Sequence, residues 1–322
     1  MRILVAGGAG FVGSHLCARL VQEGHTVYCV DNLSTGRKRN IESLMRSPRF
    51  SFVPRCVLEP LWLPVDAIFN LASPASPPHY QSQPESTLRT NVEGTRRLLQ
   101  LATETRSRFI YASSSEVYGD PAQHPQKEDY LGNVKTMGPR ACYDEGKRCA
   151  ETICYLYQES GVPVSVVRIF NTYGPRMRLD DGRAVSNLLT QALRGEPLTV
   201  YGDGSQTRSF CYVDDLVEGF VRLLDLEDGL PGPLNLGNPE EVTVLDLAKL
   251  VLRLTGSKSK LTFASLPVDD PVRRCPDITR ATELLGWAPK TSLEEGLGRS
   301  IHYFRRAVHE HAEPEPSAAI VA

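Results

Sequence analysis

The stretch VAGGAGFVGSHL, residues 5–16, places glycines at positions 7, 8, 10 and 13 between an apolar strand-like run and the start of a helix. Glycine lets the backbone turn tightly and approach a pyrophosphate, whose negative charge the amino end of the following helix favours. Such a glycine pattern is weak evidence by itself. Because a strand precedes it and a helix follows it, it predicts a dinucleotide-binding strand–turn–helix unit.

Asp31 strengthens this prediction, because it lies at the end of the next strand-like run, TVYCV, about twenty residues beyond the glycines. A carboxylate at that place can accept hydrogen bonds from both ribose hydroxyls of the adenosine and would repel a 2′-phosphate. The sequence therefore favours NAD over NADP. The cationic run Arg37, Lys38 and Arg39 nearby leaves NADP as the alternative.

The order of elements predicts the rest of the fold. Short apolar runs (ILVA, TVYCV, FSFV, AIFNLA, RFIYAS and VSVVRIF) alternate with helical segments, which indicates a parallel sheet with helices on both faces. After about Asn171, helical segments at 186–194, 214–224, 244–255 and 292–304 mix with short strands, LTVYG and LTFA. We predict an α/β protein: a Rossmann-like, doubly wound, NAD-binding domain (residues 1–170) and a smaller C-terminal α/β lobe for the substrate (171–306). Some elements of the lobe are expected to return to the main domain.

Composition excludes several classes of function. The formal net charge of -2 gives no case for nucleic acid or an anionic membrane surface, and no apolar run approaches the length of about 18 residues that spans a bilayer. The 8 cysteines form no metal-binding pattern and lie in apolar surroundings, so we expect free thiols, a reducing compartment and no metal site. Strand-like sequence from residue 2 argues against a targeting peptide, so the expected location is cytoplasmic. Residues 307–322, rich in Pro, Glu and Ala, are expected to form a disordered tail.

A second motif carries reaction chemistry. YDEGK places Tyr143 and Lys147 four residues apart, on one face of a helix. An ammonium near the phenol, with a positive nicotinamide ring close by, is expected to lower the tyrosine pKa towards neutrality, so that tyrosine can accept a carbinol proton. The strand-end sequence SSSEVYG adds hydroxyls at Ser113–Ser115 and a carboxylate at Glu116.

With these motifs the chain resembles the extended short-chain dehydrogenase/reductases that act on nucleotide sugars, and among them the UDP-glucuronate decarboxylases (UDP-xylose synthases). The resemblance runs from Arg2 to about Phe304. It rests on the strings NLASPASPPHY, ASSSEVYGDP, GPRACYDEGKR, RIFNTYGPRM, GEPLTVYGDGSQTRSFCYVDDLV, NLGNPEE and DDPVRRCPDI.

The resemblance implies a reaction. Related dehydratases carry an Asp-Glu pair where this chain has Ser115 and Glu116, and simple epimerases usually lack the glutamate. Oxidation at carbon 4 of UDP-glucuronate would allow loss of carbon dioxide, followed by reprotonation at carbon 5 and re-reduction to UDP-xylose. By similarity Tyr143 is the base, Lys147 tunes it and Ser114 contacts the carbon 4 oxygen. Ser115, Glu116 and Arg274 would then serve the carboxylate, although a cap at the strand end is the plainer interpretation of Glu116.

The same resemblance implies binding residues. For the substrate they are Glu116, Asn171, Tyr201, Arg208 and Arg274. For NAD they are Gly7, Gly10, Phe11, Val12, Gly13, Asp31, Asn32, Gly36, Leu71, Ser73, Thr90, Tyr143, Lys147, Thr172 and Arg183. Cys56 departs from the family, which usually has an aspartate there for the adenine amino group.

Other functions stay open on the sequence. A UDP-sugar 4-epimerase or dehydratase on the same fold is the main alternative, and a non-catalytic NAD-dependent sensor is another. Apolar residues at helical spacing in 84–105 (Leu88, Val92, Leu99, Ala102) and 143–160 (Ala150, Ile153, Leu156, Tyr157) favour a homodimer through a four-helix bundle, as in similar enzymes. The alternative is that both stripes only face the sheet.

Overall fold

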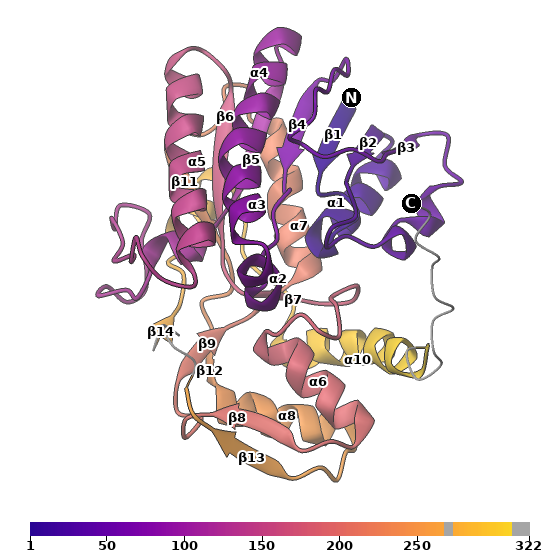
Figure 1. Ribbon diagram of the computed structural model, residues 1–322, viewed down its shortest axis with the longest axis vertical. Helices are drawn as coiled ribbons and strands as arrows, with labels where there is room; N and C mark the ends of the chain where they lie inside the picture. The colour runs from indigo at the N-terminus through magenta and orange to yellow at the C-terminus, as the bar shows by residue number, and fades with distance from the viewer. Residues whose placement is uncertain (267–272, 311–322) are drawn as a thin grey trace.

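A parallel sheet forms the centre of the protein. The computed structural model describes residues 1–266 and 273–310, and within them the main sheet has seven strands in the order β11-β6-β5-β4-β1-β2-β3 (Figure 1). All neighbouring pairs in this sheet run parallel. The strands are β1 (Arg2–Ala6), β2 (Thr26–Val30), β3 (Phe50–Val53), β4 (Ala67–Asn70), β5 (Arg108–Ser114), β6 (Val164–Ile169) and β11 (Pro233–Leu236). This is the predicted doubly wound, Rossmann-like architecture.

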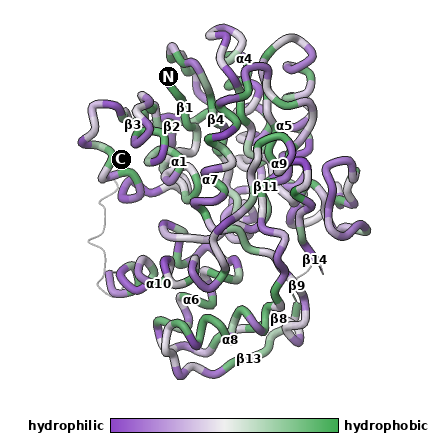
Figure 2. Tube along the Cα trace, turned by 180° about the vertical axis from the view of Figure 1, so that it is seen from behind, coloured by the Kyte–Doolittle hydropathy of each residue, from purple (hydrophilic) through white to green (hydrophobic). Residues whose placement is uncertain are grey.

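Helices cover both faces of the sheet, which explains why the strands are apolar without interruption. In β1, Ile3 and Val5 enter one core and Leu4 and Ala6 the other, as the alternation of side chains along a strand requires. On the first face α1 (Phe11–Gln22) packs beside α7 (Val213–Arg222), and on the second α4 (Thr95–Thr105) packs beside α5 (Ala141–Glu159). Figure 2 shows the apolar stretches along β1 and β4 between these layers.

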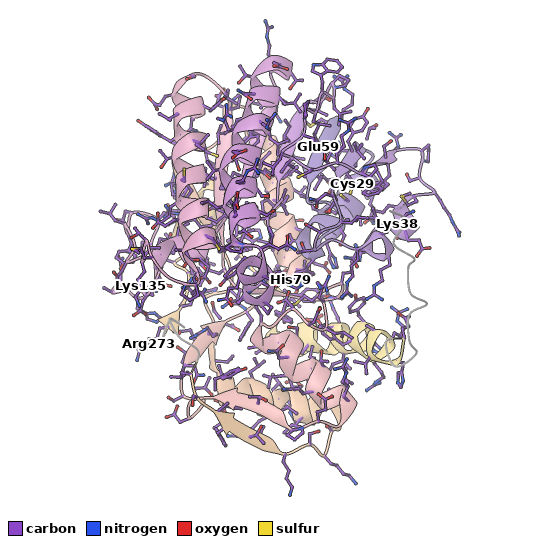
Figure 3. All side chains as sticks on the ribbon, in the orientation of Figure 1. Cys29, Lys38, Glu59, His79, Lys135 and Arg273 are labelled. Atoms are coloured by element: carbon purple, nitrogen blue, oxygen red, sulfur yellow. The ribbon has the colours of Figure 1, made fainter. Side chains whose placement is uncertain are left out.

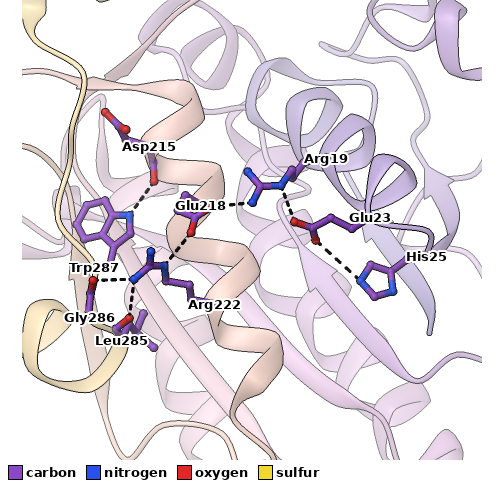
Figure 4. A network of polar contacts seen from close by, with 9 residues as sticks. All are labelled: Arg19, Glu23, His25, Asp215, Glu218, Arg222, Leu285, Gly286 and Trp287. Carbon is purple, nitrogen blue, oxygen red and sulfur yellow. Dashed lines mark hydrogen bonds and ion pairs between the residues drawn. The ribbon is translucent and has the colours of Figure 1, made fainter.

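A polar network fastens α1, α7 and a later segment to one another (Figure 4). Arg19 on α1 donates to Glu218 on α7 over 2.7 Å, and Arg222 donates to the other oxygen of Glu218 over 2.9 Å. Arg222 also donates to the carbonyl oxygens that end α9 (Thr279–Leu285), while the indole of Trp287 donates to the Asp215 carbonyl over 2.8 Å. The C-terminal part of the chain is thereby held on the same face as the first helix.

The smaller lobe lies below the carboxyl ends of the strands in Figure 1. It contains α6 (Ala184–Arg194), α8 (Val244–Thr255), α10 (Leu293–Glu310) and the parallel pair of β8 (Leu198–Tyr201) with β13 (Leu261–Ala264). Around the junction β9 (Thr207–Ser209) pairs with β12 (Glu241–Thr243) and β14 (Arg273–Arg274), and β7 (Thr172–Tyr173) pairs with β10 (Cys211–Tyr212). Between these elements the chain returns to the main sheet through α7 and β11.

Two sequence-based expectations need correction. The segment 84–105 is helical throughout, as expected, but it is not a regular α-helix: α3 (Pro84–Arg89) and α4 are joined by a π-helical turn, Thr90–Gly94, a feature that often marks a functional site. The expected tail does not begin at residue 307, because α10 continues to Glu310 with Ala307 buried in the core. Residues 311–322, the remainder of that tail, lie outside the described part. Among the described helices none has both the length and the apolar character of a membrane span.

Candidate active site

The glycine-rich turn is closely packed against neighbouring backbone. Gly7 has φ +76°, and a Cβ there would lie 2.7 Å from the Leu71 carbonyl oxygen. A Cβ on Gly13 would lie 2.2 Å from the Gly7 carbonyl oxygen. Both positions require glycine, and the turn leaves the start of α1 uncovered for a diphosphate, as predicted from residues 5–16.

Asp31 lies beside this turn at the carboxyl end of β2. Its side chain is buried and accepts hydrogen bonds from the backbone N–H groups of Ala9 (2.9 Å) and Leu33 (2.8 Å). Burial raises the pKa of Asp31, and these hydrogen bonds act in the opposite direction. Each carboxylate oxygen still has a lone pair for a ribose hydroxyl. Asp31 therefore both orders the turn and can receive a ribose.

The surroundings of Asp31 favour NAD over NADP. Arg37 pairs with Asp180 at 3.6 Å and Arg39 with Glu310 at 3.7 Å, so the cationic run that could favour a 2′-phosphate is engaged elsewhere. Figure 3 shows Lys38 at the edge of the molecule. Cys56, which departs from the family pattern, lines the cavity at Asp31 together with Arg55 and Val57.

Most of the residues expected to bind the cofactor line this cavity or the one that adjoins it. The cavities share Gly7, Gly10, Leu71 and Ser73 as lining residues. Gly36 is instead packed against Asp31, since a Cβ there would lie 2.8 Å from the carboxylate. The other expected residues on the walls are Phe11, Val12, Gly13, Asn32, Thr90, Tyr143, Lys147, Thr172 and Arg183. A turn that only glycine can form and a ribose-accepting carboxylate at the strand end suit NAD.

Tyr143 and Lys147 lie in the first turns of α5 and face the same cavity as Ser114. The Ser114 side chain lies close enough to the Tyr143 hydroxyl to act on it, and it lowers the pKa of the tyrosine. The Lys147 Nζ donates to the Ala112 carbonyl oxygen over 2.7 Å and lies 5.7 Å from the centre of the Tyr143 ring. The structure thus brings together the tyrosine, lysine and strand-end serine that the sequence singled out.

The expected lowering of the tyrosine pKa is not found in the protein alone. Burial raises the pKa of Tyr143 to about 12, although the nearby Ser114 side chain and the charge of Arg183 oppose this. Burial also lowers the pKa of Lys147 to about 7, so the lysine is a weaker cation than the sequence suggested. Both changes have one cause, because a site closed to water disfavours the tyrosinate as well as the ammonium ion.

Glu116 is held by two guanidinium groups. It lies in the 3-10 turn Ser115–Tyr118, which the Ser114 hydroxyl caps by accepting the Glu116 N–H at 3.2 Å. The carboxylate of Glu116 accepts from Arg140 at 2.5 Å and pairs with Arg274 at 3.3 Å. Ser114, rather than Glu116, is therefore the cap of this strand end.

At Glu116 the neighbouring positive charges have a larger effect on the pKa than burial has. Burial would raise the pKa of Glu116, but the attraction of Arg274 and Arg140 outweighs it and holds the pKa at about 2. Arg274 also donates to the Ser115 hydroxyl over 3.0 Å and to the Gly119 carbonyl over 2.8 Å. Its Nε is buried without a hydrogen-bond partner among the described residues.

The expected substrate residues line a further cavity that continues from Tyr143 and Glu116 into the smaller lobe. Asn171, Tyr201, Arg208 and Arg274 lie on its walls. Tyr201 is half exposed and able to stack on a ring, whereas Arg208 is buried and donates to the Thr207 carbonyl. This cavity thus combines an amide, cationic side chains and an exposed aromatic ring, which suits an extended nucleotide sugar.

Sequence reasoning missed Arg140, Asp144 and Tyr80. Arg140 contacts Glu116, and Asp144, in the first turn of α5, lies 3.8 Å from Arg140. The ring of Tyr80 stacks on Tyr143 with centres 5.1 Å apart, on α2 (Pro77–Ser82). A signal for Arg140 and Asp144 existed in the string GPRACYDEGKR, because residues 140 and 144 are one helical turn apart. No local pattern pointed to Tyr80.

Comparison with other proteins agrees with this geometry. Residues 3–237 match the NAD dependent epimerase/dehydratase family. The sequence is 53% identical over 325 residues to UDP-glucuronic acid decarboxylase 1 of Xenopus tropicalis, covering 99% of this chain and 77% of that protein. The chain belongs to the UDP-glucuronic acid decarboxylases of this family. UDP-glucuronic acid decarboxylase 2 of Arabidopsis thaliana is also 53% identical, over 99% of this chain and 72% of its own length.

Solved structures place the fold in the same family. UDP-glucuronic acid 4-epimerase from Bacillus cereus, in complex with UDP-glucuronic acid and NAD, is 30% identical with a TM-score of 0.87. The similarity covers 95% of this chain and 100% of that one. The protein is therefore an NAD-dependent enzyme of the decarboxylase type, and the epimerases share its architecture.

Proposed function

We propose that the protein decarboxylates UDP-glucuronate to UDP-xylose through a 4-keto intermediate. The observation that carries this proposal is the ionised Glu116, held between Arg140 and Arg274 next to the Tyr143–Ser114 pair. Guanidinium groups beside a reacting sugar can hold its carboxylate, since the planar fork matches both oxygens. This arrangement suits a substrate that carries a carboxylate at carbon 5.

The first step needs a proton acceptor at the carbon 4 hydroxyl. NAD, when bound, takes up the hydride from carbon 4 and later returns it, and it adds a positive charge beside Tyr143. Tyr143 accepts the hydroxyl proton and Ser114 orients the oxygen. Lys147, anchored to the Ala112 carbonyl of β5, lies beside the Tyr143 ring and favours the charged form of the tyrosine. Since burial keeps the Tyr143 pKa at about 12 in the protein alone, the proton transfer depends on the charged cofactor being in place.

The second step is the loss of carbon dioxide. The ketone at carbon 4 lies β to the carboxylate, so the electron pair of the breaking C–C bond enters an enolate, which hydroxyl donors stabilise. Tyr143, now protonated, and Ser114 are the donors at that oxygen. We propose that the unpartnered Nε of Arg274 and the Ser115 hydroxyl orient the carboxylate side of the ring.

Product analysis by mass spectrometry after incubation with UDP-glucuronate tests the function. Loss of carbon dioxide is the expected result. Isomerisation or loss of water would instead indicate the epimerase or dehydratase alternative, and an unchanged substrate would indicate a sensor without catalysis.

Cofactor retention is a separate prediction. Because the hydride is returned in each turnover, the purified protein should carry bound NAD, and catalytic amounts of added NAD should suffice. Gly13→Ala should lose the cofactor, since its Cβ would lie 2.2 Å from the Gly7 carbonyl oxygen, whereas Gly298→Ala has open space and should retain it. The nicotinamide released on denaturation measures occupancy. A requirement for NAD in proportion to substrate, with reduced cofactor accumulating, would contradict the prediction.

We also propose a homodimer through α3 and α5. The apolar residues that recur at helical spacing in 84–105 and 143–160 fall into two groups. Leu99, Ala102 and Ala150 are buried against the sheet, whereas Leu88 is 41% and Leu156 57% exposed on the outer side. Exposed apolar residues on adjacent helices, joined by Tyr155 at 57%, suit a two-fold contact.

Light scattering at micromolar concentration tests the dimer. The unmodified chain is expected to be dimeric and Leu156→Glu monomeric, because a carboxylate would be buried at the contact. Leu284→Glu, at an exposed leucine on α9, is the matched control and should stay dimeric. A monomeric unmodified chain would mean that the stripes serve only the sheet.

Two further assignments complete the proposal. The eight cysteines are free thiols, which supports a reducing compartment such as the cytoplasm. We propose that residues 1–170 bind NAD and that 171–306 hold the nucleotide sugar, with α7 and β11 serving the main sheet.

A further inference from the structure

Decarboxylation has a proton requirement that the residues described so far do not meet. If the proposed function holds, the bond from carbon 5 to the carboxylate is replaced by a C–H bond, so each turnover consumes one proton from solvent. This proton must reach a buried carbon atom. The site therefore needs a group that is protonated near neutral pH and connected to water.

Glu116 is a poor source for this proton. It faces the reacting cavity, but Arg274 and Arg140 hold its pKa at about 2 although burial opposes them. A carboxylate with this pKa is ionised at neutral pH and can accept a hydrogen bond from water, but it cannot store a proton for delivery.

Asp144 has the properties that Glu116 lacks. It is 6% exposed, and its Oδ1 has no hydrogen-bond partner among the described residues. Its Oδ2 lies 3.8 Å from Nε of Arg140, the residue that also contacts Glu116. Burial and the nearby charge of Glu116 raise the pKa of Asp144 to about 7. A buried carboxyl group in this setting exchanges its proton at neutral pH.

A cavity beside Asp144 opens to water and adjoins the reacting site, with which it shares Glu116, Arg140 and Arg274 as lining residues. Its walls include Glu116, Gly119, Lys135, Arg140, Asp144 and Arg274. Lys135 is exposed, and Figure 3 shows it on the side of the molecule where Arg273 also projects, so this end of the cavity reaches the surface. Glu116, at the other end, also lines the cavity of Tyr143. The wall between solvent and substrate is thus formed by Glu116 and its arginines.

We propose that Asp144 is the proton-relay residue of the decarboxylation. The O–H bond of the Asp144 carboxyl group breaks as its proton passes to a water in the cavity, and that water, oriented by ionised Glu116, gives a proton to carbon 5. The electron pair left by carbon dioxide becomes the new C–H bond. Solvent then reprotonates Asp144 through the open end of the cavity, so one proton enters for each carbon dioxide that leaves.

The charges around Asp144 come from several elements. Glu116 comes from the 3-10 turn and Arg274 from β14. Arg140 precedes α5, Glu145 lies on α5 itself, and Lys135 lies at the mouth of the cavity. Glu116 and Glu145 favour the protonated form of Asp144, whereas Arg140 and Arg274 oppose it. Substrate binding places another carboxylate near Arg274. This carboxylate offsets the positive charge that lowers the pKa of Asp144, so the protonated form of Asp144 is favoured further.

Asp144→Asn removes the exchangeable proton while keeping the size of the side chain. Single-turnover measurements with enzyme-bound NAD should show normal oxidation at carbon 4 and slower formation of UDP-xylose, by about 10²-fold, at the low end of general acid catalysis. The donor must be protonated, so in the unmodified enzyme the rate of product formation, divided by the rate of oxidation at carbon 4, should fall as the pH rises through about 7. The ratio removes the change that Lys147, whose pKa is also about 7, makes to the oxidation step. The variant should lack this fall, and Asp144→Glu should restore it.

Controls separate this role from a structural one. Asp129→Asn changes an exposed aspartate of the preceding loop and should leave rate and pH profile unchanged. Carbon dioxide release by the unmodified enzyme is measured first, since its absence defeats the proposed function itself. If carbon dioxide is released but Asp144→Asn keeps the normal rate and pH profile, the relay is wrong. If the variant does not fold, the unmodified enzyme still tests the relay. A rate ratio that does not fall near pH 7 in the unmodified enzyme is equally decisive against the relay.

Discussion

Tyr143→Phe is expected to lower turnover by about 10²–10⁴-fold, the range for loss of general acid–base catalysis, and to do so at the oxidation step. The variant loses the hydroxyl that meets Ser114 and keeps the ring that stacks on Tyr80 at 5.1 Å. Reduced nicotinamide should therefore fail to form on addition of UDP-glucuronate, although both ligands still bind. Near-ultraviolet absorbance follows the cofactor, and calorimetry follows binding.

A matched control exists on the same helix. Tyr157→Phe removes a hydroxyl at the far end of α5, where the ring packs against the sheet, and should turn over normally. If Tyr143→Phe formed reduced nicotinamide at the normal rate, Tyr143 would not be the proton acceptor. Tyr143→Phe is also expected to be about as stable as the unmodified protein, since only the buried hydroxyl is removed and the ring keeps its packing.

Glu116→Gln should fail at a different step. The amide keeps the shape of the side chain but loses the charge that orients water towards carbon 5. We expect oxidation at carbon 4 to proceed and turnover to fall by about 10²-fold or more, as for other general acid–base defects. Reduced nicotinamide should then accumulate on the enzyme, in contrast to Tyr143→Phe. Normal turnover of Glu116→Gln would show that the charge of Glu116 has no role in the reaction.

The same substitution has a cost in stability, because it leaves Arg274 buried without its anion. Breaking a buried ion pair by changing one partner typically costs about 3–5 kcal/mol, and the bonds of Arg274 to Ser115 and Gly119 reduce this. The folded pKa of Glu116, about 2, lies below its ordinary 4.5, so its stabilising contribution is complete above about pH 4.5 and is lost as the pH falls towards 2. Acid unfolding of Glu116→Gln should lack that loss.

Two variants serve as controls for Glu116→Gln. Glu93→Gln breaks an exposed pair with Arg89, 3.1 Å apart, and should change stability by less than about 1 kcal/mol. Arg274→Ala should weaken substrate binding more than it slows oxidation, because it removes a cation proposed to hold the substrate carboxylate, while Arg140 still pairs with Glu116. Comparing binding, oxidation and product formation in these variants assigns each residue to a step.

Much of the site could be predicted because it rests on local rules. The glycine turn, Asp31 and the Tyr143–Lys147 spacing each follow from the geometry of one or two elements, and the structure places them around one cavity system. The prediction that failed concerns the pKa values of Tyr143 and Lys147. The sequence shows that a lysine and a tyrosine share a helix face, but not that both are buried, and burial decides the direction of both pKa values.

The cluster around Glu116 could not be derived from sequence patterns. Arg140 reaches it across 24 residues of sequence and Arg274 across 158, through a 3-10 turn, a helix start and the short strand β14. Similarity suggested Arg274 but gave it the substrate as its partner. In the structure its guanidinium is already engaged by Glu116, Ser115 and Gly119.

The sequence by itself determined the sheet, the cofactor turn and the placing of Tyr143 and Lys147 on one helix face, because apolar periodicity, glycine spacing and helical spacing act over a few residues. The tertiary structure alone decided that Asp144, one residue from that tyrosine, faces a separate cavity with an unpartnered oxygen, and that Glu116 stays ionised. The reason is physical: the charge state of a buried group depends on every charge within a few ångströms and on access to water. Those neighbours come from distant parts of the chain and meet only when it folds.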